Sequence, residues 1–301
     1  MNILITGGTG LIGSALIPFL NNHHKVTVLT RNVTKVYVKI GSHIHAIENL
    51  SQIDFNQIDI VLNLAGEAIV EKRWSKKQKL KIQQSRWQLT QELVNRIIEA
   101  KTPPHTFISG SAIGFYGRQN NQAIDESFDE CCQEFSHTLC KEWESIALNA
   151  RSEKTRVCIL RTGIVLSSHG GALSKMLPAY KCALGGPIAD GSQMMSWIHI
   201  DDMIGMIIYL VEEQALEGVF NATAPNPVSN SEFSSQLAET LKRPNFFRMP
   251  AQVLSLLLGE AAELLIYGQN VQPNKILKAG YRFHYPKLKE ALSHLLRHHS
   301  E

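Results

Sequence analysis

The stretch that decides the fold is NILITGGTGLIG, residues 2–13. Its first five residues are mostly apolar and predict a buried β-strand, and the glycines after them predict a tight turn into a helix. The turn satisfies both the GxGxxG and the TGxxGxxG spacing. Glycine lets the backbone approach phosphates, and the start of the helix offers unpaired N–H groups and the positive end of its dipole. The segment therefore predicts that a nicotinamide dinucleotide binds through its diphosphate at Gly7, Thr9, Gly10, Leu11, Ile12 and Gly13.

Strand and helix patterns alternate over the residues that follow. We expect strands at residues 25–29, 43–47, 58–64, 106–109 and 156–160, and helices near 11–20, 76–100 and 137–150. Apolar strands that alternate with helices predict an α/β fold, a Rossmann-type doubly wound parallel sheet covered on both faces. We expect this dinucleotide-binding domain to span residues 1–166, with return segments near 197–222.

Beyond residue 167 the chain contains more glycine and proline loop signals between short helical patterns. The helices are expected near residues 202–213, 231–242, 251–258 and 286–296. They predict a smaller, mostly helical substrate lobe over residues 167–248 and a helical C-terminal extension over residues 249–301. We expect His294, His298 and His299 at the solvated end of the last helix and in a frayed tail.

Composition excludes several classes of function. The 301 residues carry a net charge of +3, too little and too evenly spread to predict a nucleic-acid surface. The longest apolar runs, residues 203–211 and 253–258, are too short to cross a bilayer, and no secretory leader is visible. The five cysteines form no CxxC pair, which favours reduced thiols and a cytoplasmic location. We expect a small-molecule substrate and no particular oligomeric state.

The end of the second strand bears on the choice of cofactor. An acidic residue there would bind the adenosine ribose hydroxyls and select NAD. This chain instead has Arg31, about 20 residues beyond the turn, where a guanidinium pairs with a 2′-phosphate. The sequence therefore predicts NADP, or NADPH in its reduced form, in preference to NAD.

Further candidates follow the ends of other strands, where open α/β sheets bind their ligands. Glu67 either points into the cleft or caps a helix, and Arg86 either contacts the cofactor or pairs with a surface acid. The other candidates lie at the ends of the fourth, fifth and sixth strands: Leu64, Ala65, Gly66, Ser109, Arg161 and Gly163.

Motifs along the whole chain resemble one protein family. They include NLAGE at residues 63–67, SRWQLT at 85–90, SGSAIGFYG at 109–117, KEWE at 141–144, RTGIVLS at 161–167, GGPIADG at 185–191 and WIHIDDM at 197–203. With the glycine turn, they resemble the atypical branch of the extended short-chain dehydrogenase/reductases. These are the epimerase family proteins, predicted NAD-dependent epimerases or dehydratases that are sometimes called cell-division inhibitors. The resemblance implies a Rossmann-type NADP-binding domain, a substrate lobe and a small helical C-terminal domain.

The resemblance also implies a catalytic set. It consists of a serine after the fifth strand, and a tyrosine and a lysine four residues apart on the next helix. Ser111 matches the serine and Lys141 the lysine, but His137 stands at the tyrosine position. Three interpretations stay open. In the first, His137 is the acid/base group, since an ordinary imidazole pKa of about 6.5 suits proton exchange. In the second, which we favour, the tyrosine is lost and His137 is an ordinary helix residue. In the third, Tyr116, just after Ser111, supplies the proton.

A polar cluster follows near the middle of the second half, at Trp197, His199, Asp201 and Asp202. A histidine with two aspartates is a donor set that binds metals. The segment resembles a structural turn, however, in which Asp201 or Asp202 caps the next helix. We therefore expect no metal here.

Two functional hypotheses follow from these features. The first is an NADP(H)-dependent oxidoreductase or epimerase that transfers a hydride at a hydroxyl or carbonyl carbon, with a sugar-nucleotide-like substrate implied by fold analogy alone. The second is a catalytically weak NADP(H)-binding regulatory protein that acts through a protein partner. The missing tyrosine motivates the second hypothesis.

Overall fold

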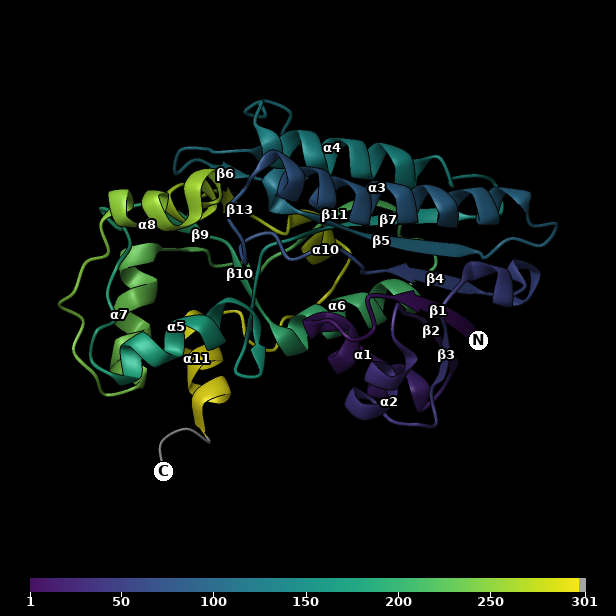
Figure 1. The fold of residues 1–301 in the computed structure, drawn as a ribbon, viewed down its shortest axis with the longest axis horizontal. Helices are drawn as coiled ribbons and strands as arrows, with labels where there is room; N and C mark the ends of the chain where they lie inside the picture. Colours follow the sequence, from purple (N-terminus) through teal and green to yellow (C-terminus); the bar gives the residue numbers. More distant parts are fainter. Residues whose placement is uncertain (298–301) are drawn as a thin grey trace.

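The computed structural model describes residues 1–297, and its central feature is a seven-stranded sheet (Figure 1). All neighbouring strands of this sheet are parallel. Their order is β11-β7-β5-β4-β1-β2-β3, so the winding reverses between β1 and β4, at the crevice where doubly wound sheets bind ligands. This confirms the predicted fold class. The strands are β1 (Asn2–Thr6), β2 (Lys25–Leu29), β3 (His45–Ile47), β4 (Ile60–Asn63), β5 (Thr106–Ala112), β7 (Arg156–Thr162) and β11 (Gly218–Ala222).

Helices cover both faces of the sheet (Figure 1). α3 (Lys76–Glu99) and α4 (Phe135–Leu148) lie on one face, and α1 (Leu11–Asn21), α2 (Val33–Lys39) and α6 (Ile200–Glu212) on the other. Successive residues of a strand point to opposite faces. Leu4 accordingly packs with the α3 and α4 side chains, whereas Ile3 and Ile5 pack with those of α1 and α6. Both faces of β1 are buried, which is why its sequence is continuously apolar.

A smaller lobe lies beyond the carboxyl ends of the strands, at the left of Figure 1. In it α5 (Gly171–Lys181), α7 (Asn230–Thr240) and α11 (Leu288–Leu296) surround a core that contains the fully buried Trp197 and Phe233. Two small sheets join them, β8 (Ile164–Ser167) with β10 (Trp197–His199), and β9 (Met194–Met195) with β12 (Val228–Ser229). The remaining helices of this part, α8 (Ala251–Leu258), η4 (Gly259–Ala262) and α9 (Glu263–Ile266), pack near Trp74.

The C-terminal residues return to the sheet domain. β13 (Asn270–Val271) pairs with β6 (Ala123–Ile124), and α10 (Asn274–Lys278) packs on β11. Asp202, fully buried in the first turn of α6, accepts hydrogen bonds from the backbone N–H groups of His284 (2.7 Å) and Tyr285 (2.9 Å). The C-terminal segment is thereby fastened to β6, β11 and α6. Single 3₁₀ turns complete the connections at η1 (Leu50–Gln52), η2 (Phe55–Gln57) and η3 (Ile113–Tyr116).

Several elements differ from the sequence-based expectation. Residues 218–222 return to the main sheet as β11, but Trp197–His199 pairs with β8 instead. The reason is Gly163, where the chain leaves the sheet after β7 and its N–H still bonds to Ala222. Helices α2 and α5 were not expected, because α2 is rich in β-branched valine and α5 contains Pro178. His298 and His299 lie outside the described residues. Within residues 1–297, no helix is both long and apolar enough to cross a membrane.

Candidate functional site

The glycine turn has the shape that a diphosphate requires. Gly7 adopts a φ of +72°, and a Cβ there would stand 2.5 Å from the carbonyl oxygen of Leu64. A Cβ on Gly13 would stand 2.5 Å from the carbonyl oxygen of Gly7. Gly10 starts α1 without any side-chain cap, and the first turn contains no acidic residue. The first N–H groups of α1, from Leu11 onward, are therefore left for an anion.

Basic side chains lie beside this turn. Arg31 is exposed directly after β2, as the sequence predicts. Lys39, in the last turn of α2, donates a hydrogen bond from Nζ to the carbonyl oxygen of Thr9 at 2.7 Å. No sequence signal pointed to Lys39, because α2 itself was not expected. The two cations place positive charge at the adenosine side of the turn, where a 2′-phosphate would bind.

The loop after β4 runs along the same edge of the sheet and contains Leu64, Ala65 and Gly66. Glu67 does not cap a helix, since Ser75 caps α3; its carboxylate pairs with Lys81 at 2.9 Å. The hydrogen bond from Lys81 holds the pKa of Glu67 below its ordinary value. Arg86 of α3 does not pair with a surface acid, as one interpretation expected. Its guanidinium lies against Gly66, where a Cβ would stand 2.9 Å from Cζ of Arg86.

A buried polar network lies behind these strand ends. The Asn63 side chain accepts from Thr6 Oγ1 at 2.8 Å and donates to Thr90 Oγ1 at 2.8 Å and Ser109 Oγ at 3.3 Å. Thr90 also accepts from the indole of Trp143 at 2.9 Å. Ser109, predicted to border the cofactor, is fully buried and directs its hydroxyl into this network. The network joins β1, β4 and β5 to α3 and α4 and so fixes the edge on which the site is built.

Ser111, the predicted catalytic serine, is held by a buried ion pair. Its hydroxyl donates to Glu144 Oε1 at 2.6 Å. Arg161 forms a two-pronged bond to the same carboxylate, with Nε to Oε1 at 2.9 Å and Nη2 to Oε2 at 2.8 Å. Both side chains of the pair are 5% exposed, so solvent screens it little. Glu144 raises the pKa of Arg161 despite its burial. Arg161 therefore acts behind Ser111, and no described contact brings its guanidinium to the cofactor turn.

Sequence reasoning missed Glu144, although a signal was present. Strand β7 reads RVCILRT, and an arginine at the inner end of such an apolar strand requires a carboxylate partner. The helix α4 that covers the strand offers Glu142 and Glu144. Only the packing of α4 decides between them: Glu142 is exposed and Glu144 is buried.

Tyr116 lies away from the place expected for a proton donor. It is fully buried, and its hydroxyl lies 2.8 Å from Asn221 Oδ1 and 3.1 Å from Nη1 of Arg161. Burial raises the pKa of Tyr116. The phenol therefore completes the network behind Ser111, on the side of Asn221. The loop geometry expected from sequence, with the phenol reaching the nicotinamide end, is not what the structure shows.

Ser136 and Cys140 of α4 pack against Gly114, in the 3₁₀ turn that follows Ser111. A Cβ on Gly114 would stand 3.1 Å from Cβ of Ser136 and 3.8 Å from Sγ of Cys140. Burial raises the pKa of the Cys140 thiol to about 11, although the nearby Arg86 acts in the opposite direction. The cysteine is therefore a neutral thiol at physiological pH.

The predicted pair on α4, residues 137 and 141, differs in burial. Lys141 is exposed, so the structure does not bring it to Ser111. His137 is 3% exposed, its Nδ1 bonds to the carbonyl of Phe115, and its Nε2 has no partner within residues 1–297. The expected pair of acid/base group and lysine is thus split between a buried imidazole and a solvated ammonium.

Gly163 also has a local structural explanation. A Cβ there would stand 2.3 Å from the carbonyl oxygen of Ser196 and 2.8 Å from Cγ2 of Thr223. The glycine therefore permits β8 and the segment before β10 to approach each other. Its predicted contact with the cofactor stays a prediction.

The polar cluster of the WIHIDDM motif joins the two lobes. His199 itself caps α6 by accepting from the N–H of Asp201, so neither aspartate is the cap as expected. His199 Nε2 lies 3.1 Å from Nδ1 of His294, which stacks on Tyr285 and is not at a solvated helix end. Burial, with His294 and His284 nearby, lowers the pKa of His199 to about 3. Ligand atoms of His199, Asp201 and His294 lie within 4.8 Å of one another, the spacing of a possible metal group.

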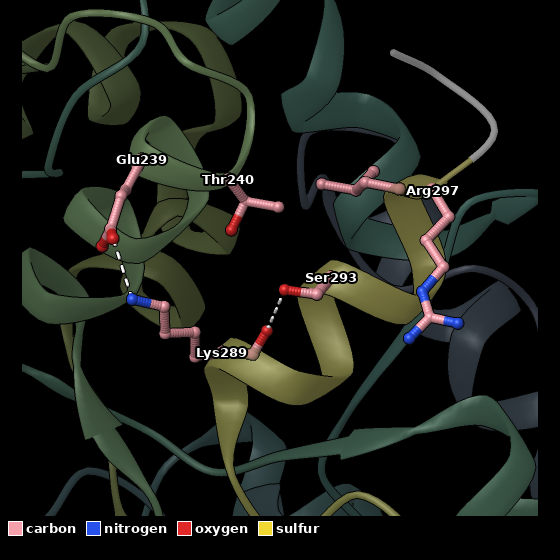
Figure 2. Close-up of a pocket in the computed structure, with 6 residues that line it drawn as sticks. Glu239, Thr240, Lys289, Ser293 and Arg297 are labelled. Atoms are coloured by element: carbon pink, nitrogen blue, oxygen red, sulfur yellow. Dashed lines mark hydrogen bonds and ion pairs between the residues drawn. The ribbon is translucent and has the colours of Figure 1, made fainter.

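A surface recess of about 390 Å³ lies between α7 and α11 (Figure 2). Figure 2 shows Lys289 paired with Glu239 across it, at 2.8 Å, and Ser293 bonded within α11. None of the residues predicted for the site lines it, and its exposed ion pair adds little stability. The recess is therefore separate from the candidate site.

The doubly wound sheet, the glycine turn before α1 and the serine at the end of β5 define a Rossmann-type dinucleotide-binding protein with short-chain reductase architecture. The chain belongs to the NAD dependent epimerase/dehydratase family, whose profile matches residues 3–222. A second profile, described as a domain of unknown function (DUF1731), matches residues 249–295. The family resemblance found in the sequence is confirmed.

Relatives match the chain over nearly its whole length. The Epimerase family protein YfhF of Bacillus subtilis is 35% identical, over 98% of each chain. The chloroplastic SDR39U1 homolog of Arabidopsis thaliana is 34% identical, over 99% of this chain and 87% of its own. Among solved structures, human epimerase family protein SDR39U1 (isoform 2) with NADPH superimposes with a TM-score of 0.91 at 32% identity, over 99% of each chain.

Proposed function

We propose that the protein binds NADP(H) and transfers a hydride between its nicotinamide and a hydroxyl or carbonyl carbon of a small-molecule substrate. The observation that carries this proposal is the glycine turn, whose Gly7 and Gly13 leave no room for a Cβ on either side of the uncapped start of α1. Arg31 and Lys39 beside the turn support NADP, and human SDR39U1, which was crystallised with NADPH, supports it by similarity.

Different residues of the chain would bind the cofactor and the substrate. The first N–H groups of α1 bind the diphosphate, and Arg31 pairs with the 2′-phosphate. NADP(H), when bound, supplies or accepts the hydride. Ser111 binds the reacting oxygen: because its hydrogen is directed at Glu144, its oxygen lone pairs are left to accept from a substrate hydroxyl. An oxidoreductase would release the oxidised or reduced product, and an epimerase would take the hydride back.

The proton carrier that we propose is His137. Its buried Nε2 lacks a partner among the described residues, whereas the hydroxyl of Tyr116 is engaged by Arg161 and Asn221. Lys141 receives no role in the chemistry, because it is exposed.

A second candidate function is supported by the α4 face. Cys140, a neutral thiol, and Ser136 pack against Gly114 just after Ser111. Lys141 is exposed, so the helix offers no titratable pair of tyrosine and lysine. A protein that binds NADP(H) and signals to a protein partner, with little turnover, would need no such pair.

We further propose a cytoplasmic location and a small-molecule substrate, with no role for nucleic acid or membrane. All five cysteines are free thiols, and Cys140 and Cys158 are buried, which suits a reducing compartment. The net charge of +3 supports no polyanion surface.

The test combines dinucleotide binding with isotope transfer. Wild-type protein is titrated with NADPH and NADH, and then incubated with 4-deuterated NADPH and a panel of aldehydes, ketones and UDP-sugars. The proposal expects NADPH binding and deuterium in a product, with transfer lost in Ser111→Ala while NADPH still binds. Binding without any transfer favours the regulatory protein. Failure to bind either dinucleotide contradicts both.

A further inference from the structure

We propose that Arg86 binds an anionic group of the substrate, a carboxylate or a phosphate, beside the reacting centre. The inference rests on the proposed function and narrows its substrate class. It also departs from the expectation that Arg86 serves the cofactor. Three features of the described residues carry it: the missing partners of the guanidinium, its position, and the charge around it.

The Arg86 guanidinium is largely unpartnered. It has five N–H donors, but only Nη1 finds acceptors, the carbonyl oxygen of Ile82 at 3.2 Å and the hydroxyl of Ser85 at 3.5 Å. Both belong to its own helix. Within residues 1–297, no carboxylate lies within ion-pair distance of it, whereas the buried Arg161 has a two-pronged partner in Glu144. Burial lowers the pKa of Arg86, but the side chain is only half-buried, so the N–H groups that it does not use within the helix remain open to a ligand.

The position of the guanidinium is at the ligand-binding edge of the sheet. Its Cζ lies against Gly66, an exposed residue directly after β4. On its other side it lies 5.3 Å from the ring of Trp143, on α4. The same Trp143 ring packs against Gly110, the residue before Ser111, where a Cβ would stand 3.3 Å from it. Arg86 therefore stands between the strand end that borders the cofactor and the serine that binds the reacting oxygen.

The guanidinium of Arg86 also supplies a positive charge that α4 does not provide. On α4, Cys140 is a neutral thiol and Lys141 is exposed. Arg161 is already paired with Glu144. At this edge of the sheet, Arg86 from α3 is therefore a cation without a carboxylate partner among the described residues. A guanidinium presents paired N–H donors that match the two oxygens of a carboxylate or phosphate, and it does not release its proton.

The segment that leads into α3, the helix of Arg86, is rich in basic residues. Residues 71–81 read EKRWSKKQKLK, with six lysines and arginines and a single glutamate. Two of the lysines pair with acids, Lys79 with Glu260 and Lys81 with Glu67, which leaves a positive excess at the start of α3. A positive rim concentrates anions and raises their rate of association.

The experiment uses malonate and inorganic phosphate as anionic probes and malonamide as the neutral match. Full-length protein, with and without saturating NADPH, is titrated with each probe by thermal shift and by NADPH fluorescence. We expect wild type to respond to malonate or phosphate and not to malonamide. In Arg86→Gln the response weakens by about tenfold or more, because charge-assisted hydrogen bonds are lost. The matched control is Lys77→Gln, which removes one positive charge from an exposed site of the same helix and leaves the response within about twofold.

The outcomes separate the inference from the proposed function. If Arg86→Gln loses NADPH binding about tenfold while Lys77→Gln does not, the guanidinium serves the cofactor and the inference is overturned. Equal anion responses in wild type and Arg86→Gln overturn it as well. If no dinucleotide binds but the anion response still depends on Arg86, the anion site stands and the proposed function fails. A circular dichroism melt of Arg86→Gln checks that the variant is folded.

Discussion

At the scale of single residues, the interior of the site depends most on Glu144. This carboxylate is shared by Ser111 and Arg161 and is nearly inaccessible to solvent. Replacing it in Glu144→Gln leaves the Arg161 guanidinium buried without a counter-charge. Removing one partner of a buried pair costs about 3–5 kcal/mol. We expect the free energy of unfolding in urea to fall by that order.

Glu142 provides the matched control for this prediction. It lies two residues earlier on the same helix and is exposed. Glu142→Gln should change the free energy of unfolding by no more than about 0.5 kcal/mol, as surface substitutions usually do. Equal, small losses in the two variants would mean that Arg161 finds water or another acceptor, and that the pair does not hold Ser111.

Arg31 is the residue on which the choice of dinucleotide depends. Arg31→Asp replaces a cation that suits a 2′-phosphate by an anion that suits two ribose hydroxyls. We expect NADPH affinity to fall by about tenfold or more, and NADH affinity to change much less or to rise. Fluorescence titration measures both. Lys35→Asp, at an exposed position of α2, controls for net charge; equal losses for the two dinucleotides in Arg31→Asp would remove the NADP assignment.

At the scale of elements, the glycine turn sets the distance between β1 and α1. A Cβ at residue 13 would meet backbone atoms on two sides, the carbonyl oxygen of Gly7 at 2.5 Å and Cα of Gly8 at 2.7 Å. Backbone cannot move aside as a side chain can. Gly13→Ala should therefore push α1 away from β1, with a loss of about 1–3 kcal/mol in the free energy of unfolding and a loss of NADPH binding.

Gly10→Ala is the comparison for this turn. Its Cβ would meet a single atom, the carbonyl oxygen of Gly7, at 3.1 Å. Thermal and urea unfolding of the two variants should rank Gly13→Ala as clearly less stable. The reverse order would show that the helix adjusts its position freely and that the tight packing at Gly13 has no energetic weight.

The elements that sequence predicts well are those with a local cause. β1, the glycine turn and α1 follow from an apolar run, required glycines and helical periodicity, all within 20 residues. α8 has the predicted bounds, 251–258, because Pro250 and Gly259 mark its two ends. No long-range contact is needed to specify any of them.

The rotation of α4 about its axis has no such local cause. Motif spacing places 137 and 141 opposite Ser111, but in the packed helix Ser111 bonds to Glu144, and Lys141 is exposed. The rotation is fixed by Trp143, which bonds to Thr90, and by Glu144, which bonds to Arg161, and these partners lie on other elements. The same applies to Lys39, since its contact with Thr9 spans 30 residues.

At the scale of the whole molecule, a histidine cluster connects the two lobes and makes the free energy of unfolding depend on pH. His199 at the start of α6 contacts His294 of α11, and His284, Asp201 and Tyr285 lie around them. The folded pKa of His199, about 3, is below the ordinary value of about 6.5, so the unfolded chain binds the proton first as pH falls. The contribution of His199 to stability is therefore complete above pH 6.5 and is lost progressively between pH 6.5 and 3.

The predicted slope is measurable. In this window the free energy of unfolding should fall by up to about 1.4 kcal/mol per pH unit on account of His199. His199→Asn keeps an oxygen that can accept from the N–H of Asp201 and removes the titration, so its stability should depend less steeply on pH. Urea unfolding at pH 7, 6, 5 and 4 gives the slope. His43→Asn, at an exposed site, should retain the wild-type slope; parallel curves for wild type and His199→Asn would contradict the prediction.

The network around Asn63 has a consequence for the evolution of the protein. Thr6, Asn63, Thr90 and Trp143 fasten the edge of the sheet from inside, whereas the half-buried Arg86 lies against Gly66 and takes no part in those hydrogen bonds. The residues that hold the scaffold are therefore different from the residue proposed to meet a substrate. An exchange at position 86 leaves the scaffold bonds intact, so a lineage can change what it binds there by a single substitution without passing through an unfolded ancestor.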